Sequence, residues 1–164
     1  MQQGGTTYTY DANGNTLTET LDSTITTYTW DAKNKLKQVD KGGGTSTYDY
    51  NVDGIRIAQT VGSDLTQFVV DSHRDYAQVI AELDASDAIL VHYTYGDDLI
   101  SQERAGATNY YHYDGLGSTR ALSDELGGFS DSYDYEAFGE VLNTTGATEN
   151  SYLYTGEQFD SQLD

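Results

Sequence analysis

YTYDANG, at residues 8–14, is the stretch of sequence that decides how this chain folds. It returns as YTWDAKN at residues 28–34 and as YDYNVDG at residues 48–54, a spacing of 20 residues each time. A weaker copy begins another 20 residues on, at Phe68. Less evenly spaced copies follow at residues 93–95, 111–114, 133–136 and 152–154. A fixed period over this many copies predicts a repeat architecture.

Aromatic residues in each copy alternate with polar ones. Successive side chains of a β-strand point to opposite faces, so Tyr8 and Tyr10 are expected on one face of one strand. The 15 tyrosines among 164 residues, together with many threonines, also favour pleated structure. We therefore predict an aromatic stripe formed by Tyr8, Tyr10, Tyr28, Trp30, Tyr48, Tyr50, Tyr111, Tyr113, Tyr133 and Tyr135.

A turn is expected directly after each aromatic pair. Asp or Asn in the first position can accept hydrogen bonds from backbone N–H groups, and Gly or Asn in the fourth tolerates positive φ. This pattern predicts a type I turn followed by a bulge. The predicted turn residues are Asp11, Gly14, Asp31, Asn34, Asn51, Gly54, Asp114, Gly117 and Gly139. The stretch at residues 71–74 fits the pattern poorly.

A second set of turns is expected about ten residues after the first, at residues 41–44, 61–64, 84–87 and 124–127. Two turns per 20 residues make one hairpin per repeat. Residues 74–83 are the only stretch that could be read as a helix, and we favour a strand there. The sequence thus predicts an all-β chain of consecutive antiparallel β-hairpins of about 20 residues. Aromatic side chains on one face would make the sheet curved and spiralling.

The charge and composition of the chain argue against several classes of partner. The 8 basic and 27 acidic residues give a formal net charge of −19, so nucleic acid and anionic membranes are poor partners. Cysteine is absent, which excludes disulfides and thiolate metal sites. No apolar run approaches 18 residues, so no membrane insertion is expected. The first residues resemble no signal peptide, and we expect the chain to be a piece of a longer protein.

The repeat resembles the Tyr-Asp (YD, or RHS) repeat family. The more specific part is C-terminal: YHYDGLGSTR at residues 111–120, YDYEAFGE at 133–140 and YTGEQFD at 154–160 are similar to the RHS repeat-associated core region. The resemblance covers residues 6–164 and divides them into YD repeats at 6–91 and the core region at 92–164. Residues 1–5 are interpreted as a starting or linker segment.

The resemblance implies a hollow shell of spiralling β-hairpins that encloses or displays a C-terminal toxin or effector domain, in an exported or cell-surface parent protein. In the family an aspartyl autoprotease follows the core region, but this chain stops before that segment and has no proline for its Asp-Pro pair. We therefore expect no enzyme activity. The expected partners are the remaining repeats and the effector of the parent protein. The open edges and aromatic face of the isolated segment predict self-association.

Several motifs suggest a specific metal, catalytic or phosphate site, but each has little support. Asp11, Asn13 and Asn15 echo the spacing of a calcium loop, but the twelfth position is Asp22 instead of Glu, so a turn is favoured. His92 and His112 lie 20 residues apart without a third metal ligand, and His73 lies in another repeat. Ser118 has no nucleophile elbow around it. The glycines at residues 42–44 and 115–117 open no helix, so they are not phosphate loops. No catalytic, cofactor or metal site is predicted.

A repeat module that binds carbohydrate or choline is the alternative function. Exposed tyrosines stack on sugar rings or form cages around quaternary ammonium groups, and such modules also repeat near 20 residues. Such modules usually carry more tryptophan, whereas this chain has only Trp30. Loss of glycan binding on changing Tyr28 and Trp30 to alanine would favour the alternative.

Overall fold

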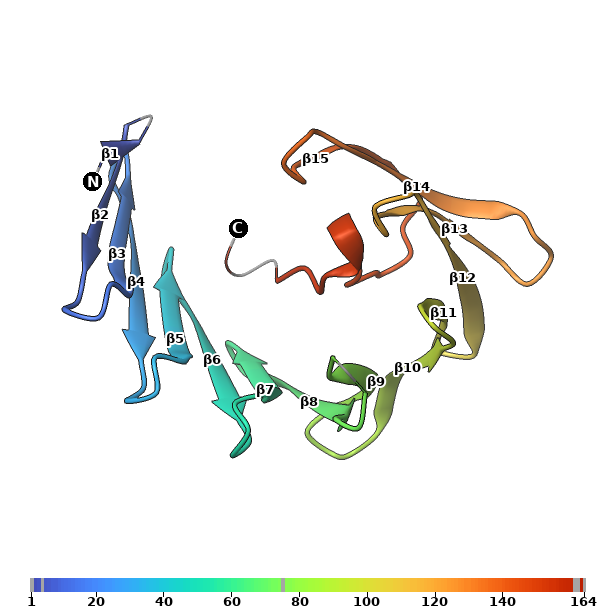
Figure 1. Cartoon of the computed structure of the whole chain (residues 1–164), viewed down its shortest axis with the longest axis horizontal. Helices are drawn as coiled ribbons and strands as arrows, with labels where there is room; N and C mark the ends of the chain where they lie inside the picture. Colours follow the sequence, from blue (N-terminus) through green and yellow to red (C-terminus); the bar gives the residue numbers. More distant parts are fainter. Residues whose placement is uncertain (1, 4, 75, 161–162, 164) are drawn as a thin grey trace. The chain divides into compact units, whose positions relative to one another are not determined.

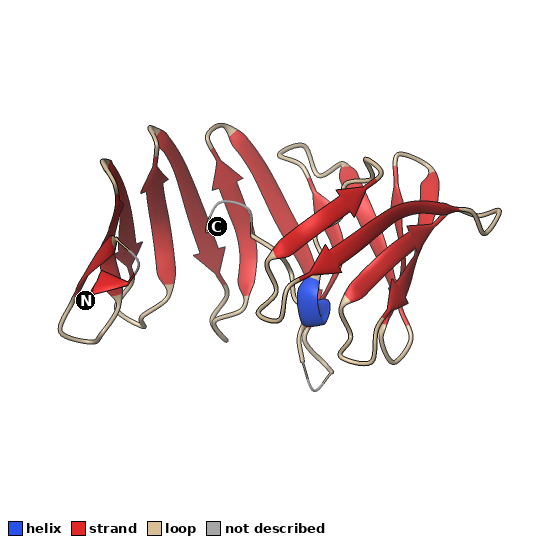
Figure 2. Cartoon of the chain, turned by 90° about the horizontal axis from the view of Figure 1, so that it is seen from above, coloured by secondary structure: helices blue, strands red, loops and turns tan. Residues whose placement is uncertain are grey.

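A computed structural model describes residues 2–3, 5–74, 76–160 and 163 (Figure 1). The chain divides into two compact units, Met1–Ala88 and Ile89–Gln162, called unit 1 and unit 2 below. Strands follow one another in sequence order, and within each unit neighbouring strands pair antiparallel. The predicted all-β class and the consecutive antiparallel order are therefore confirmed. In Figure 2 the chain consists of strands and loops, with very little helix.

Unit 1 contains the even-spaced repeats. Its strands are β1 (Gln2–Gln3), β2 (Thr6–Tyr10), β3 (Thr16–Leu21), β4 (Thr24–Trp30), β5 (Leu36–Lys41), β6 (Gly44–Tyr50), β7 (Arg56–Val61), β8 (Asp64–Asp71) and β9 (Gln78–Leu83). The strand β1, which pairs Gln2 with Thr7 and Gln3 with Thr6, falls in the segment interpreted as a start or linker. The strand β9 confirms the strand reading of the stretch that a helix could have occupied.

Unit 2 continues the pattern and then departs from it. Its strands are β10 (Ile89–Tyr95), β11 (Leu99–Arg104), β12 (Ala107–Tyr113), β13 (Thr119–Ser123), β14 (Phe129–Tyr135) and β15 (Val141–Thr145). After β15 the described chain forms no further strand and only the short 3-10 helix η1 (Tyr154–Gly156). In the described residues no helix is long and apolar enough to cross a membrane.

Each aromatic pair ends at a β-bulge. The register shifts between Thr9 and Tyr10, so that Tyr10 pairs with Thr16 although Thr9 pairs with Thr18. The same shift precedes Trp30 and Tyr50 in unit 1. In unit 2 it precedes Tyr95, Tyr113 and Tyr135. An extra residue on one strand is what the turn-plus-bulge pattern predicts, and the bulge is confirmed.

Asp11 shows how the turns are held. Its Oδ1 accepts hydrogen bonds from the backbone N–H groups of Asn13 at 2.8 Å and Asn15 at 2.9 Å, while Gly14 takes φ +89°. The same two bonds recur at Asp31, Asn51 and Asp114, and the fourth turn residue has positive φ at Asn34, Gly54, Gly117 and Gly139. Local side-chain bonds of this kind fix the turn without help from the rest of the fold.

The second set of turns is chemically mixed. Asp84 and Asp124 accept the same pair of backbone N–H bonds as Asp11. By contrast, the link between β11 and β12 is a tight turn in which Ala105 and Gly106 take φ +51° and +79°. That turn was not predicted, because alanine gives no signal for positive φ. The spacing of about ten residues therefore predicted the positions of these turns better than their conformation.

The core lies on the aromatic side of the strands and is denser in unit 2. Buried apolar side chains in unit 1 are Val39, Tyr48, Phe68 and Ala81; those in unit 2 are Val91, Tyr93, Leu99, Tyr111, Leu122, Tyr133, Tyr152 and Leu153. Buried polar side chains are also concentrated in unit 2, where Gln102, Ser118 and Thr119 are fully shielded from solvent. Polar groups that leave water need hydrogen-bond partners, so these side chains must be bonded within unit 2.

Candidate functional site

The aromatic side of the strands is the candidate site, and we call it the aromatic wall. Its first aromatics are Tyr8, Tyr28, Tyr48, Phe68, Tyr93, Tyr111 and Tyr133; its second aromatics, two residues later where the copy has one, are Tyr10, Trp30, Tyr50, Tyr95, Tyr113 and Tyr135. Residues paired directly across strands share a face. Tyr28 therefore lies beside Val39, Tyr48 beside Gln59 and Tyr111 beside Leu122.

The second aromatics tie each hairpin to the one before it. Trp30 Nε1 donates to the carbonyl oxygen of Thr16 at 2.7 Å, and the Tyr50 hydroxyl donates to that of Leu36 at 2.9 Å. In unit 2 the hydroxyls of Tyr113 and Tyr135 donate in the same way to Leu99 and Thr119, at 2.7 and 2.8 Å. Each acceptor is the first residue of the preceding strand.

These hydrogen bonds explain why the second aromatic of each pair carries a polar atom: it connects two consecutive hairpins. The acceptor carbonyl belongs to the residue at the preceding bulge, where the strand ladder is disrupted and a carbonyl is available. One ring therefore packs on the wall and satisfies a backbone group one hairpin away. These rings were predicted for the stripe, but their hydrogen bonds to the preceding hairpin were not. The constant separation of 14 residues for the first three would have been the signal.

Glu19 links the first aromatics of the first two repeats. Its two carboxylate oxygens accept from the hydroxyls of Tyr8 at 3.2 Å and Tyr28 at 3.0 Å. Burial, followed by the hydrogen bond and the negative charge of Glu19, raises the pKa of Tyr28 to about 12. The same causes raise the pKa of Tyr8. A carboxylate at this place keeps both phenols protonated and joins β2, β3 and β4 through their side chains.

In unit 2 the wall is covered by the chain itself. Residues 146–157, called the cover below, run back over β11 to β14 after the end of β15. Thr119 donates its backbone N–H to the carbonyl oxygen of Leu153 at 2.9 Å and its hydroxyl to that of Tyr152 at 2.7 Å. The Tyr152 ring meets Tyr93 edge-on, with centroids 5.1 Å apart. The cover thus adds both backbone bonds and an aromatic ring to the wall.

The cover also satisfies the buried polar side chains. Gln102 donates through Nε2 to the carbonyl oxygen of Glu149 at 2.9 Å, and Tyr111 donates to Asn150 Oδ1 at 2.9 Å. The Ser118 hydroxyl oxygen accepts from the backbone N–H of Thr155 at 3.0 Å. These contacts explain why fully shielded polar residues are tolerated in unit 2.

Asp131 anchors the start of the cover. Its Oδ1 accepts the backbone N–H of Thr148 at 2.9 Å. Burial acts to raise the pKa of Asp131, but hydrogen bonds from Ser130 and Thr148 outweigh it and hold the pKa below its ordinary value. The carboxylate is therefore kept ionised, which suits an acceptor for backbone N–H groups.

The predicted stripe residues differ widely in exposure. Tyr48, Tyr111 and Tyr133 are buried, whereas Tyr10 is 45% exposed. The remaining predicted members, Tyr8, Tyr28, Trp30, Tyr50, Tyr113 and Tyr135, lie half-buried. Tyr93 and Tyr152, both of which are buried, were not among the predicted stripe residues. Tyr152 was read as part of a further copy of the repeat, and only its contacts show that it lies on the wall as part of the cover.

The weaker candidates can now be placed. Both carboxylate oxygens of Asp11 accept from Asn15, one of them also from Asn13, so the calcium-like spacing forms a turn. His92 and His112 are not cross-strand neighbours, because β11 lies between their strands and His92 pairs with Glu103. Among the described residues no group of three or more His, Cys, Asp or Glu could hold a metal ion.

Comparisons with known proteins agree with this architecture. No protein-family model matches the chain. It is 37% identical, over 93% of its length, to the "tRNA3(Ser)-specific nuclease WapA" of Bacillus spizizenii and to the "tRNA nuclease WapA" of Bacillus subtilis strain 168. The chain spans only 7% of the length of each of these proteins.

Solved structures show a similar fold. A crystal structure of TcdB2-TccC3 matches 93% of the chain with a TM-score of 0.68 and 19% identity, and the chain covers 9% of it. The Tc holotoxin pore of Photorhabdus luminescens matches 96% with a TM-score of 0.56 and 14% identity, and the chain covers 11% of it. At these identities the likeness concerns the fold alone.

Proposed function

We propose that this RHS (Tyr-Asp) repeat chain is a non-catalytic piece of a β-shell that encloses or displays a C-terminal toxin or effector domain. The observation that carries the proposal is the chain of bonds from each second aromatic to the hairpin before it. These hydrogen bonds use the polar atoms of Trp30 and the tyrosines to connect consecutive hairpins. Such connections stabilise a continuous sheet, as a shell requires.

The parent protein supplies the rest of the shell. The chain spans 7% of the Bacillus relatives, which are named as tRNA nucleases. We assign the nuclease chemistry of such a protein to a part outside this segment, because a surface with a net charge of −19 repels the phosphates of RNA. In this proposal the partners of the segment are neighbouring repeats and the enclosed domain, and the parent is exported.

The alternative carbohydrate- or choline-binding function has less support. Stacking on a sugar needs a free aromatic face and usually a polar ring atom that can serve the ligand. Trp30 Nε1 is already bonded to Thr16, and the Tyr28 hydroxyl is bonded to Glu19. These contacts favour a structural role for the two residues that would otherwise be the best ligand platform.

Limited proteolysis of the protein encoded by the whole reading frame tests the proposal. A domain inside an intact shell is protected until the shell opens, so Tyr50→Ala together with Tyr113→Ala should speed its digestion. The matched control is Val52→Thr, at a side chain that is 87% exposed. Equal digestion of the effector in all three proteins would reject the shell.

Two assays of the 164-residue chain complete the test. Incubation with tRNA should give no cleavage, and cleavage would overturn the non-catalytic assignment. A glycan array should show no binding. Binding that is lost in the Tyr28→Ala, Trp30→Ala double variant would instead establish the alternative function.

A further inference from the structure

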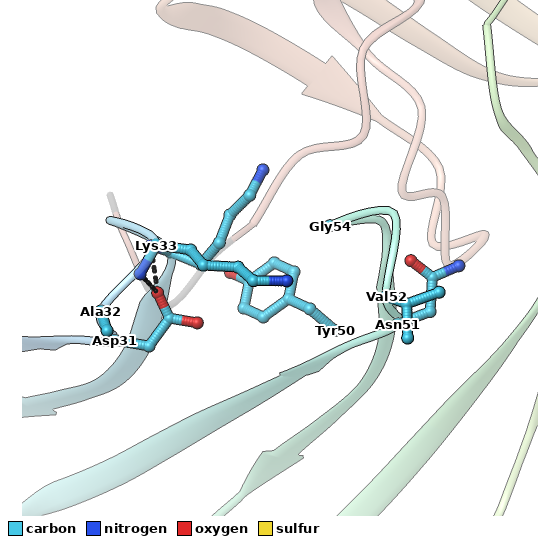
Figure 3. Close-up of a pocket in the computed structure, with 8 residues that line it drawn as sticks. Asp31, Ala32, Lys33, Tyr50, Asn51, Val52 and Gly54 are labelled. Atoms are coloured by element: carbon cyan, nitrogen blue, oxygen red, sulfur yellow. Dashed lines mark hydrogen bonds between the residues drawn. The ribbon is translucent and has the colours of Figure 1, made fainter.

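A pocket with two lysines lies between neighbouring turns of unit 1, and the aromatic wall gives no reason for it. It lies between the turn that starts at Asp31 and the turn that starts at Asn51, and has a volume of about 430 Å³. Figure 3 shows the two turns on opposite sides, with the Tyr50 ring between them. Lys33 and Lys35 line it together with Asp31. Two cations therefore face one carboxylate, on a chain whose net charge is −19.

The preceding pair of turns shows how the same gap is closed by side chains of the chain itself. Between the Asp11 and Asp31 turns, Asn13 Nδ2 and Asn15 Nδ2 both donate to Asn34 Oδ1, at 3.0 and 2.8 Å. Two donors on one turn thus meet one acceptor oxygen on the next. The acceptor stands in the fourth position of its turn, at φ +59°.

In the pocket the donors are kept and the acceptor is missing. Lys33 and Lys35 occupy the turn positions of Asn13 and Asn15, while Gly54, at φ +78°, occupies the position of Asn34. In the part of the chain that the structure describes, neither lysine Nζ forms an ion pair, and that of Lys35 lies 5.9 Å from the centroid of the Tyr50 ring. A Cβ at Gly54 would lie 2.9 Å from Lys35 Cε, so a side chain there would displace the flexible end of Lys35 and enter the gap.

The carboxylate of Asp31 is already committed to its own turn. Its Oδ1 accepts the backbone N–H groups of Lys33 at 2.7 Å and Lys35 at 2.9 Å. The bond from Lys35 lowers the pKa of Asp31, and the bond from Lys33 and the charges of Lys33 and Lys37 add to this against an opposing effect of burial. Asp31 shapes the turn that presents the two ammonium groups, and the pocket keeps a net positive lining.

We propose that this pocket binds an oxyanion, a phosphate or a carboxylate, whose oxygen takes the place that Asn34 Oδ1 occupies in the preceding pair of turns. Ammonium-to-oxyanion hydrogen bonds are stronger than the amide-to-amide bonds they replace. The acidic surroundings weaken the attraction, so binding is expected at millimolar concentration and falls with added salt.

Titration of the 164-residue chain with sodium phosphate, followed by the backbone amide NMR signals, tests the site. Ionic strength is held constant with sodium chloride, and sodium acetate forms a second arm. We expect shifts at residues 33–35 and 51–54 and none at residues 11–15, whose amides already have their acceptor. Tighter phosphate binding assigns the site to phosphate groups, and equal or tighter acetate binding assigns it to carboxylates.

Two variants test whether oxyanion binding depends on the absence of an acceptor side chain at residue 54. Gly54→Asn supplies the acceptor from the chain, as Asn34 does, and tolerates the positive φ; it should weaken oxyanion binding about tenfold or more. Lys33→Asn with Lys35→Asn should do the same without touching Gly54, and decides the matter if the first variant misfolds. Shifts that chloride alone reproduces, that persist in these variants, or that do not occur in the original chain would overturn the proposal.

Discussion

Each unit builds an aromatic wall from the same repeat, but the two walls differ in what lies over them. In unit 2, Tyr93 is 2% exposed and Tyr111 8% exposed, beneath a cover formed by residues 146–157. In unit 1 the corresponding Tyr8 and Tyr28 are half-buried, and Tyr10 is 45% exposed. The repeat therefore determines which rings line each wall. In unit 2 the cover adds to their burial, whereas in unit 1 Tyr48 reaches 1% exposure without a cover and the rings of the first two repeats stay half-buried or exposed.

The difference also concerns polar groups. Unit 1 joins its first repeats through Glu19, a charged side chain that bridges two half-buried phenols. Unit 2 places Gln102 at the corresponding cross-strand position, fully shielded and bonded to the cover. An ionised carboxylate is costly to bury, while an amide can be buried once its hydrogen bonds are made. At these two positions the residue opposite the tyrosine thus suits its environment: a carboxylate where it is half-buried and an amide where it is fully shielded.

Removing the cover's central ring should have the largest effect. Tyr152→Ala deletes a buried aromatic that packs against Tyr93, and we expect a loss of about 3–5 kcal/mol in the free energy of unfolding. Tyr10→Ala, in the uncovered wall, should cost less, about 1 kcal/mol, because that residue is already 45% exposed in the folded chain. Urea unfolding followed by circular dichroism measures both. Similar losses for the two variants would mean that the cover adds little to unit 2.

Glycines at one turn position should also respond differently in the two units. Gly14 and Gly139 have φ +89° and +98°, so alanine strains either turn by about 1–2 kcal/mol. A Cβ at Gly14 meets nothing within 4 Å, but at Gly139 it would lie 2.7 Å from Tyr154 Cδ1 in the cover. Gly139→Ala should therefore cost a further 1–3 kcal/mol or so. Equal melting temperatures for the two variants would argue that Tyr154 does not pack there.

The bonds of the second aromatics should instead cost about the same in both units. Tyr50→Phe and Tyr113→Phe each remove one hydrogen bond to a backbone carbonyl, and we expect about 1 kcal/mol from each in urea unfolding. Tyr10→Phe is the matched control, since in the described residues its hydroxyl has no hydrogen-bond partner. A loss at Tyr10 equal to the other two would show that the hydroxyl bonds are not what is being measured.

The smallest effect is expected in the titration of the phenols. The pKa of Tyr28 is raised to about 12 by burial and by Glu19, and that of Tyr135 to about 12 by burial and then by Tyr133. Glu19→Gln should lower the pKa of Tyr28 and leave that of Tyr135 unchanged, as read from the ring carbon NMR shifts. An unaltered Tyr28 would exclude Glu19 as a cause.

The sign of the accompanying stability change follows from linkage. A phenol whose pKa is raised on folding holds its proton more firmly in the folded state than in the unfolded one. Its contribution to stability is complete below pH 10, the ordinary pKa of tyrosine, and is lost as the pH rises through about 12. Glu19→Gln should make this loss shallower in unit 1.

Much of the fold was predictable from local chemistry. Tyr-x-Tyr alternation defines strands, and Asp11 with Gly14 defines a turn whose hydrogen bonds all lie within five residues. The aromatic side of the wall follows from the same alternation. The tight turn at Ala105 and Gly106 was not predictable in this way, because the strands on either side force an alanine into positive φ.

The sequence by itself determined the repeat, the turns, the antiparallel order and the residues available to the wall, because each depends on contacts within one hairpin or between adjacent strands. Only the tertiary structure decided that Trp30 and its counterparts bond to the preceding hairpin, that Tyr152 covers unit 2, and that Gly54 leaves two lysines around an open pocket. Those features join residues of different repeats or a segment outside them, and no local pattern specifies how such distant groups meet.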